Sequence, residues 1–156
     1  MNITHPAHQE MLAALLENKV DFILVGGYAV IYHGYIRTTG DMDVWLRPTE
    51  NNKTKLIEVF TRLKFNSDDI NLIEKLDFSG TVIFHIGAEP DRIDFLTRVN
   101  GLNFEEAYNN RVFLKIDDNE IPILKLEDLI TNKLITGRLK DKADIEQLNM
   151  IRKRKK

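Results

Sequence analysis

One short stretch of the chain restricts the fold more than any other part. Four apolar residues, Phe22 to Val25, form a run of strand length that stops at Gly26 and Gly27. Residues 28–33 then have helical character. In residues 41–46, Met, Val and Leu alternate with Asp, Asp and Trp, which is the two-residue period of a strand. The stretch therefore predicts a buried strand, a glycine turn, a short helix and a second strand.

Periodic apolar residues predict further helices and strands on both sides of this stretch. Strand patterns dominate the middle of the chain and helical patterns its two ends. We therefore expect an α/β (α+β) fold with a mixed β-sheet, helices packed mainly on one side and a helical C-terminus. The further helices are expected at Pro6 to Asn18, at Thr49 to Leu63 and after Leu126, and the further strands at Thr81 to Ile86, Arg92 to Leu96, Val112 to Ile116 and Ile121 to Leu124.

Length and composition limit the class of protein. With 156 residues, 43% of them hydrophobic and 29% charged, the chain is expected to fold as a single domain over residues 1–156. The absence of cysteine excludes disulfides, thiolate metal sites and a cysteine nucleophile. The first residues lack the features of a secretory signal, and apolar runs stay well below the roughly 18 residues of a membrane span. We therefore expect a cytoplasmic protein without a membrane partner.

The charge is distributed unevenly along the chain. A net charge of −2 gives no overall basic field that would attract nucleic acid. C-terminal helices are expected at about residues 125–150, and a strongly basic tail follows at residues 152–156. Two interpretations of this tail stay open, a solubilising end of the chain and a phosphate contact.

Two carboxylates, Asp41 and Asp43, stand two residues apart on the second predicted strand. Residues at this spacing point to the same face, about 7 Å apart along the backbone. Their charges repel one another unless a cation lies between them. Hard, oxygen-seeking Mg²⁺ or Mn²⁺ is the natural occupant of such a place. A solvated strand face is the alternative interpretation of the same pattern.

Two further features favour a metal-assisted site. Gly26 and Gly27 would let the backbone approach a ligand closely, and the following helix would offer N–H groups to a phosphate. A tight turn is the simpler interpretation of the same pair. Asp94, which alternates with apolar neighbours on another predicted strand, would add a third carboxylate and complete a two-metal site. Asp91 is the competing candidate, but it lies in the expected turn before that strand.

Together these motifs resemble the signature of the DNA-polymerase-β-like nucleotidyltransferase superfamily. The residues that carry the resemblance are, in order, Val25 to Val30, His33, Gly34, Arg37, Thr39, Asp41 to Val44 and the later Asp94. The C-terminal part is similar to the last helices of small bacterial nucleotidyltransferases of the abortive-infection and toxin–antitoxin type, through Leu126 to Leu129, Lys133, Gly137, Arg138, Lys140, Asp141, Asp144 and Ile145. The match covers roughly residues 25–148.

This resemblance implies transfer of a nucleoside monophosphate (NMP) from an NTP to a hydroxyl acceptor, with Mg²⁺ or Mn²⁺ as cofactor. Carried over by position, Asp41 and Asp43 would bind both metal ions. Asp94 would bind the catalytic ion and help to deprotonate the acceptor. Gly26 and Gly27 would hold the β- and γ-phosphates through their amides. The superfamily more commonly has serine after the first glycine, so other donors must contribute more in this chain.

Extra contacts with the nucleotide are expected from three cations, Arg37, Lys133 and Arg138. A cation beside a triphosphate offsets the charge that builds up on the leaving pyrophosphate. For Lys133 and Arg138, the alternative is a solvated helix face with the ion pairs Arg138–Asp141 and Lys140–Asp144.

Four residues near the motifs have two interpretations each. Arg37 either contacts phosphate or forms a salt bridge with one of the paired aspartates. Trp45 shares their face by alternation, so it either borders the nucleotide pocket or packs as an ordinary aromatic side chain. His33 is expected to bond the backbone rather than to act in catalysis, and His85 is expected to be an ordinary cross-strand residue.

The acceptor stays open among tRNA, a protein and a small molecule. A macromolecular acceptor, or a partner protein of a toxin–antitoxin pair, would supply the binding surface for which the chain shows no second domain. The alternative function is a non-catalytic, antitoxin-like or regulatory module that keeps the fold. The three intact carboxylates argue against this alternative. A hydrolase would need a positioned water and a general base, which the sequence does not identify.

Overall fold

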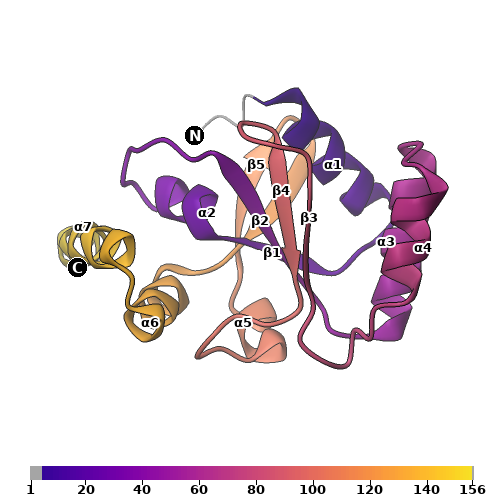
Figure 1. Cartoon of the computed structure of the whole chain (residues 1–156). Helices are drawn as coiled ribbons and strands as arrows, with labels where there is room; N and C mark the ends of the chain where they lie inside the picture. Colours follow the sequence, from indigo (N-terminus) through magenta and orange to yellow (C-terminus); the bar gives the residue numbers. More distant parts are fainter. Residues whose placement is uncertain (1–4, 156) are drawn as a thin grey trace.

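The computed structural model describes residues 5–155 and contains one six-stranded sheet with strand order β3-β4-β2-β1-β6-β5 (Figure 1). Residues 1–4, where the absence of a secretory signal was inferred, and Lys156, the last residue of the basic tail, lie outside the described residues. The elements are α1 (Pro6–Glu17), β1 (Phe22–Val25), α2 (Gly26–Tyr32), β2 (Asp41–Leu46), α3 (Glu50–Arg62), α4 (Ser67–Glu74), β3 (Ile83–Ile86), β4 (Arg92–Leu96), α5 (Phe104–Asn109), β5 (Val112–Ile116), β6 (Asn119–Ile123), α6 (Leu126–Thr136) and α7 (Leu139–Arg154).

Capping residues explain where several helices begin and end. Thr49 precedes α3 and accepts a hydrogen bond from the Asn52 N–H, as expected of an N-cap threonine. Gly137 ends α6 in the left-handed conformation, with φ +68°. Helix α7 continues through Arg154, so residues 152–154 of the basic tail form its last turn rather than a separate segment.

Two helices, α4 and α5, lie outside the elements expected from the sequence. Helix α4 has eight residues and buries only Ile73 among them, and α5 has six residues. Segments this short give too few repeats for a helical period to be recognised. Both begin at an asparagine whose side chain accepts a backbone N–H, Asn66 for α4 and Asn103 for α5. Local capping therefore defines these two helices where periodicity does not.

The sheet is mixed, which confirms the expected fold class. Strand β1 runs antiparallel to β2 and parallel to β6, while β2 runs parallel to β4. Strands β3 and β5 pair antiparallel with β4 and β6 at the two ends of the strand order. The parallel pairing of β2 with β4 places two strand segments side by side that are about 50 positions apart in the sequence.

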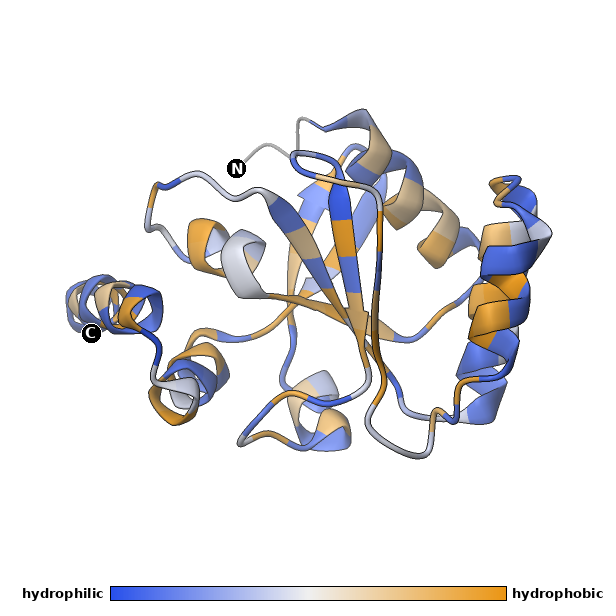
Figure 2. Ribbon diagram, in the orientation of Figure 1, coloured by the Kyte–Doolittle hydropathy of each residue, from blue (hydrophilic) through white to orange (hydrophobic). Residues whose placement is uncertain are grey.

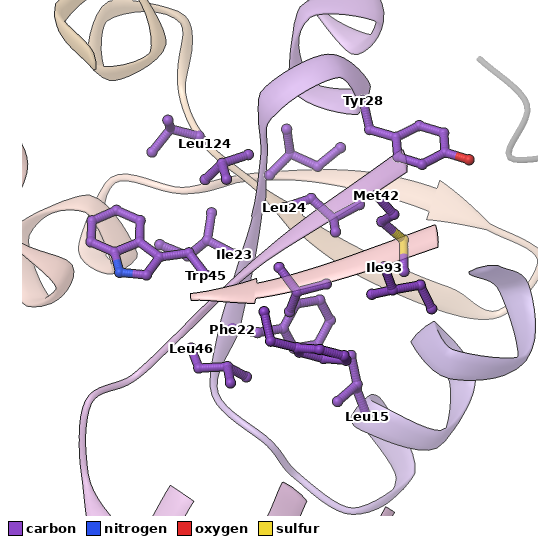
Figure 3. Packing of buried hydrophobic residues seen from close by; sticks show 14 of the residues in the cluster. Leu15, Phe22, Ile23, Leu24, Tyr28, Met42, Trp45, Leu46, Ile93 and Leu124 are labelled. Atoms are coloured by element: carbon purple, nitrogen blue, oxygen red, sulfur yellow. The ribbon is translucent and has the colours of Figure 1, made fainter. Parts of the chain in front are cut away.

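Helices cover both faces of the sheet, so packing is shared more evenly than the expected arrangement on mainly one side. Figure 1 shows α1, α3 and α4 on one side and α2, α6 and α7 on the other. The reason is β1, whose four residues are all buried, so apolar side chains need cover on both faces. Figure 3 shows Trp45, Ile23 and Leu124 on one side of the central strands and Leu15, Leu46 and Ile93 on the other.

Strands β2 and β4 differ from β1 in their hydropathy. Figure 2 shows β1 hydrophobic along its length, whereas hydrophilic and hydrophobic residues alternate in β2 and β4. Met42, Val44 and Phe95 are buried on one face, and the aspartates between them are only partly buried on the other. One face of these two strands therefore belongs to the core and the other is available to a ligand. Within residues 5–155, no helix has both the length and the apolarity needed to cross a membrane.

Candidate active site

Three carboxylates meet on the partly exposed face of β2 and β4. The parallel register pairs Asp43 with Asp94 directly, and Asp41 lies two residues before Asp43 on the same face. One carboxylate oxygen from each of the three residues lies within 4.8 Å of the others. Arg92 donates from Nε to Asp94 Oδ1 at 3.0 Å, which holds one oxygen of that carboxylate. The spatial convergence expected of these three aspartates is present.

Two of the three carboxyl groups, Asp41 and Asp43, have a raised pKa in the absence of a cation. Burial, together with the charges of Asp41 and Asp94, raises the pKa of Asp43 to about 7. Burial and the neighbouring Asp94 also raise the pKa of Asp41, while Lys140 opposes this shift. Negative charge is therefore unfavourable at this place unless a cation compensates for it.

We expect binding of a divalent cation to weaken as the pH falls through 7. Because the pKa of Asp43 is about 7, a proton competes with the cation for this carboxylate at lower pH. Each unit of pH below that value should weaken Mn²⁺ binding by roughly 10-fold. Titration of Mn²⁺, followed by electron paramagnetic resonance at pH 6 and pH 8, measures this. Equal affinity at the two pH values would contradict the raised pKa.

The glycine turn lies against one of the carboxylates. Gly26 has φ +64°, and a Cβ atom added to it would lie 2.1 Å from Asp43 Oδ2. Both the backbone conformation and the close approach therefore require glycine at this position. The main chain that leaves β1 consequently passes directly beside the carboxylate cluster.

A cavity of about 560 Å³ connects the carboxylates with the glycine turn and the C-terminal helices. It contains every candidate site residue from the sequence, namely Gly26, Gly27, Arg37, Asp41, Asp43, Asp94, Lys133 and Arg138. Sequence reasoning did not identify its other lining residues, which include Arg92, Arg98, Asn100, Asn132, Thr136 and Lys140. The alternation that pointed to Asp94 also places Arg92 on the same face. Lys140 carried part of the family resemblance, but the only contact expected of it was an ion pair with Asp144.

Lys133 belongs to a buried cluster of charges behind the cavity. Its side chain is 4% exposed, and Nζ lies 3.1 Å from Asp141 Oδ1 and 2.8 Å from Asp144 Oδ2. Arg138 binds Asp141, as expected from their spacing, and Arg37 binds Asp144. Burial alone would raise the pKa of Asp141, but hydrogen bonds from Arg138 and Lys133 lower it overall. We define these five residues as the buried ion cluster, after the buried Lys133, Asp141 and Asp144 at its centre, while the Arg138 side chain is 63% exposed.

The structure bears on three residues whose interpretation the sequence left open. Arg37 forms its salt bridge with Asp144, 107 residues away in the chain, rather than with one of the paired aspartates. Asp144 pairs with Lys133 and Arg37 instead of with Lys140, so Lys140 stays at the cavity. Trp45 is buried against the Phe104 ring, and its indole N–H donates to the Thr97 carbonyl, so it does not border the cavity.

Three further residues, His33, His85 and Asp91, lie outside the catalytic arrangement, as the sequence predicts. The Nε2 atom of His33 lies 2.8 Å from the Leu124 carbonyl oxygen in a buried position. His85 is an exposed cross-strand residue, paired in register with Asp94. Asp91 is 57% exposed and faces His5, outside the carboxylate cluster.

A mixed sheet with three clustered aspartates, beside a glycine turn that leads into a short helix, is the arrangement that the resemblance to nucleotidyltransferases implies. The chain belongs to the family described as "nucleotidyltransferase of unknown function (DUF6036)", whose sequence profile matches residues 6–154.

Solved structures of low sequence identity share the fold. One is a Thermotoga maritima protein assigned as a nucleotidyltransferase, with TM-score 0.59 and 15% identity over 90% of this chain and 88% of that one. Another is the lincosamide antibiotic adenylyltransferase LnuA in its lincomycin-bound form, with TM-score 0.56 and 18% identity over 97% of this chain and 99% of that one. Among curated proteins, no sequence match is found.

Proposed function

We propose that this protein transfers an NMP from an NTP to a hydroxyl acceptor with the help of divalent cations. The observation that carries the proposal is the convergence of Asp41, Asp43 and Asp94 within one cavity. Family membership supports NMP transfer, and the neighbouring cations in the cavity suit a triphosphate. We also propose that residues 1–156 form one nucleotidyltransferase domain.

The donor atoms of the cluster fit Mg²⁺ or Mn²⁺. All three groups are carboxylates, and hard cations of this kind prefer oxygen ligands. Repulsion among these carboxylates is what a divalent cation would relieve. When bound, such ions lower the pKa of an attacking hydroxyl and neutralise a triphosphate.

Different residues of the chain would contribute to different parts of the reaction. The acceptor oxygen forms a bond to the α-phosphorus, the bond from that phosphorus to the β-phosphate oxygen breaks, and pyrophosphate leaves. Asp94 would take the proton from the acceptor hydroxyl. The amides of Gly26 and Gly27 would bind the β- and γ-phosphates. Arg37 and Arg138 would face the charge that develops on pyrophosphate.

We assign Lys133 an indirect part in nucleotide binding and Lys140 a direct one. The ammonium group of Lys133 is engaged by two buried carboxylates, so it acts by holding the buried ion cluster that positions Arg37 and Arg138. Lys140 is exposed at the cavity, and its charge already acts on Asp41 and Asp43. It is therefore a further cation for the triphosphate.

The acceptor is proposed only by chemical class, as a hydroxyl group of a tRNA, a protein or a small molecule. The similar fold of the lincosamide adenylyltransferase shows that this fold can accommodate an antibiotic acceptor in that protein. At 18% identity, the similarity supports a shared fold and does not identify the acceptor of this chain. Membership of the toxin–antitoxin type, with a partner protein, stays a prediction.

Calorimetric titration of each NTP, with Mg²⁺ or with EDTA, tests the proposal. We expect one NTP to bind in the presence of Mg²⁺ and not in EDTA. Asp94→Asn should retain NTP binding but abolish the slow release of pyrophosphate to water or to an added acceptor. Asp91→Asn is the matched control, because this carboxylate lies three residues away but faces His5 outside the cluster.

Absence of NTP binding under every metal condition would overturn the proposal. So would equal loss of pyrophosphate release in Asp94→Asn and Asp91→Asn, because the loss would then not depend on the cluster. An NTP that binds equally well in EDTA would contradict the role of the cation while leaving a nucleotide-binding site.

A further inference from the structure

The side chain of Thr39 occupies the space that a side chain at position 27 would need. A Cβ atom added to Gly27 would lie 2.5 Å from Thr39 Oγ1 and 2.8 Å from Thr39 Cβ. Real Cβ atoms essentially never come that close to another heavy atom, so one of the two positions must be small. Gly27 has an ordinary φ, and its restriction therefore comes from Thr39 rather than from backbone conformation.

The hydroxyl of Thr39 lies against two oxygen atoms of one of the proposed metal ligands. Its Oγ1 atom donates to the Asp41 carbonyl at 3.0 Å and lies 3.4 Å from Asp41 Oδ1. A single hydroxyl thus lies between the main chain and the carboxylate of the same residue. A contact of this kind selects one orientation of the Asp41 side chain.

We propose that Thr39 is a positioning residue, which fixes the Asp41 carboxylate for the divalent cation, and that Gly27 is glycine to leave room for it. The inference rests on the proposed function, since it takes Asp41 as a metal ligand. Thr39 and residue 27 then form a reciprocal pair: the hydroxyl can come from one position or from the other, but not from both. This pairing assigns a role to the threonine of the motif.

The Mn²⁺ affinity of the protein without nucleotide is the first measurement. Thr39→Val keeps the shape of the side chain and removes the hydroxyl, so we expect Mn²⁺ to bind about 10-fold more weakly. Thr39→Ser keeps the hydroxyl and should bind Mn²⁺ as the wild type does. Thr38→Val is the matched control, because Thr38 is the exposed neighbouring threonine. Thermal melting without metal shows whether each variant is folded.

The second measurement is the Mn²⁺ affinity of variants in which the side chains at positions 27 and 39 are exchanged. Gly27→Ser alone should weaken Mn²⁺ binding by at least about 10-fold, because the new side chain displaces Thr39. Combining it with Thr39→Ala frees the space and returns a hydroxyl from position 27. The double variant should therefore bind Mn²⁺ more tightly than Gly27→Ser, a rescue that two independent structural defects would not give.

The outcomes separate this inference from the proposed function. Equal Mn²⁺ affinity in Thr39→Val and Thr38→Val overturns the positioning role, and so does a double variant no better than Gly27→Ser. A wild type that binds Mn²⁺ but no NTP overturns the proposed function, while the same Mn²⁺ affinities still decide the role of Thr39. A wild type that binds Mn²⁺ only together with an NTP overturns the role of Thr39 and leaves the proposed function, whereas one that binds neither Mn²⁺ nor an NTP overturns both.

Discussion

Asp43→Asn is expected to lower NMP transfer by at least about 10³-fold, because removing a metal ligand forfeits several kcal/mol of transition-state stabilisation. The same substitution should make the metal-free protein more stable at pH 8. The pKa of Asp43 is raised to about 7 in the folded chain, whereas a free aspartate titrates near pH 4. The folded state therefore binds more protons between these values, and its stability falls as the pH rises from about 4 to about 7.

Chemical denaturation in EDTA at pH 5 and pH 8 checks the stability part, and pyrophosphate release checks the activity part. At pH 5 only the first part of this loss of stability has accrued, so the variant should unfold at a slightly higher denaturant concentration than the wild type. At pH 8 the full loss is present, so the difference between the two denaturant concentrations should be much larger. A variant that is less stable than the wild type at pH 8 would show that the ionised Asp43 is not destabilised by burial and by its neighbours.

Lys133→Met should destabilise the protein by about 3–5 kcal/mol, because it removes a cation from between two buried carboxylates. Asp141 and Asp144 are 0% and 2% exposed, and the remaining partners, Arg138 and Arg37, each reach only one of them. The loss would be measured as a shift in the urea midpoint. We expect nucleotide binding to weaken too, since Arg37 depends on Asp144 for its position.

Lys140→Met is the matched control for this second prediction. It removes a lysine from the same pair of helices, but Lys140 is exposed at the cavity and lies outside the buried ion cluster. Its stability should change by less than about 0.5 kcal/mol, as for ordinary surface substitutions. If Lys133→Met and Lys140→Met lower the free energy of unfolding equally, Lys133 stabilises the fold no more than an exposed lysine does.

Much of the fold could be predicted from the sequence because the signals are local. The apolar run at residues 22–25 and the alternation at residues 41–46 belong to single strands, and Thr49 identifies the start of α3. The arrangement of helices on two faces depends on which elements cover β1. That information lies in contacts between distant segments, so a local period does not contain it.

The carboxylate cluster could be predicted because two-residue alternation determines the face of each aspartate, and adjacent parallel strands then bring these faces together. The buried ion cluster has no such signature. The partner of Arg37 lies 107 residues away, and nothing in the local sequence distinguishes Asp144 from an exposed helical aspartate. The two interpretations of Trp45 could not be separated for a similar reason, since its cover by Phe104 comes from the unpredicted helix α5.

The salt bridge between Arg37 and Asp144 has a consequence for the order in which a nascent chain acquires its parts. A ribosome adds about 5–20 residues per second, so the 107 positions between the two partners take roughly 5 to 20 seconds to synthesise. During that interval the aspartates of β2 already exist, but Arg37 lacks its partner, and β6, the parallel neighbour of β1, is added only in its later part. The salt bridge on which the proposed nucleotide site depends therefore forms only after Asp144 of α7 has been made.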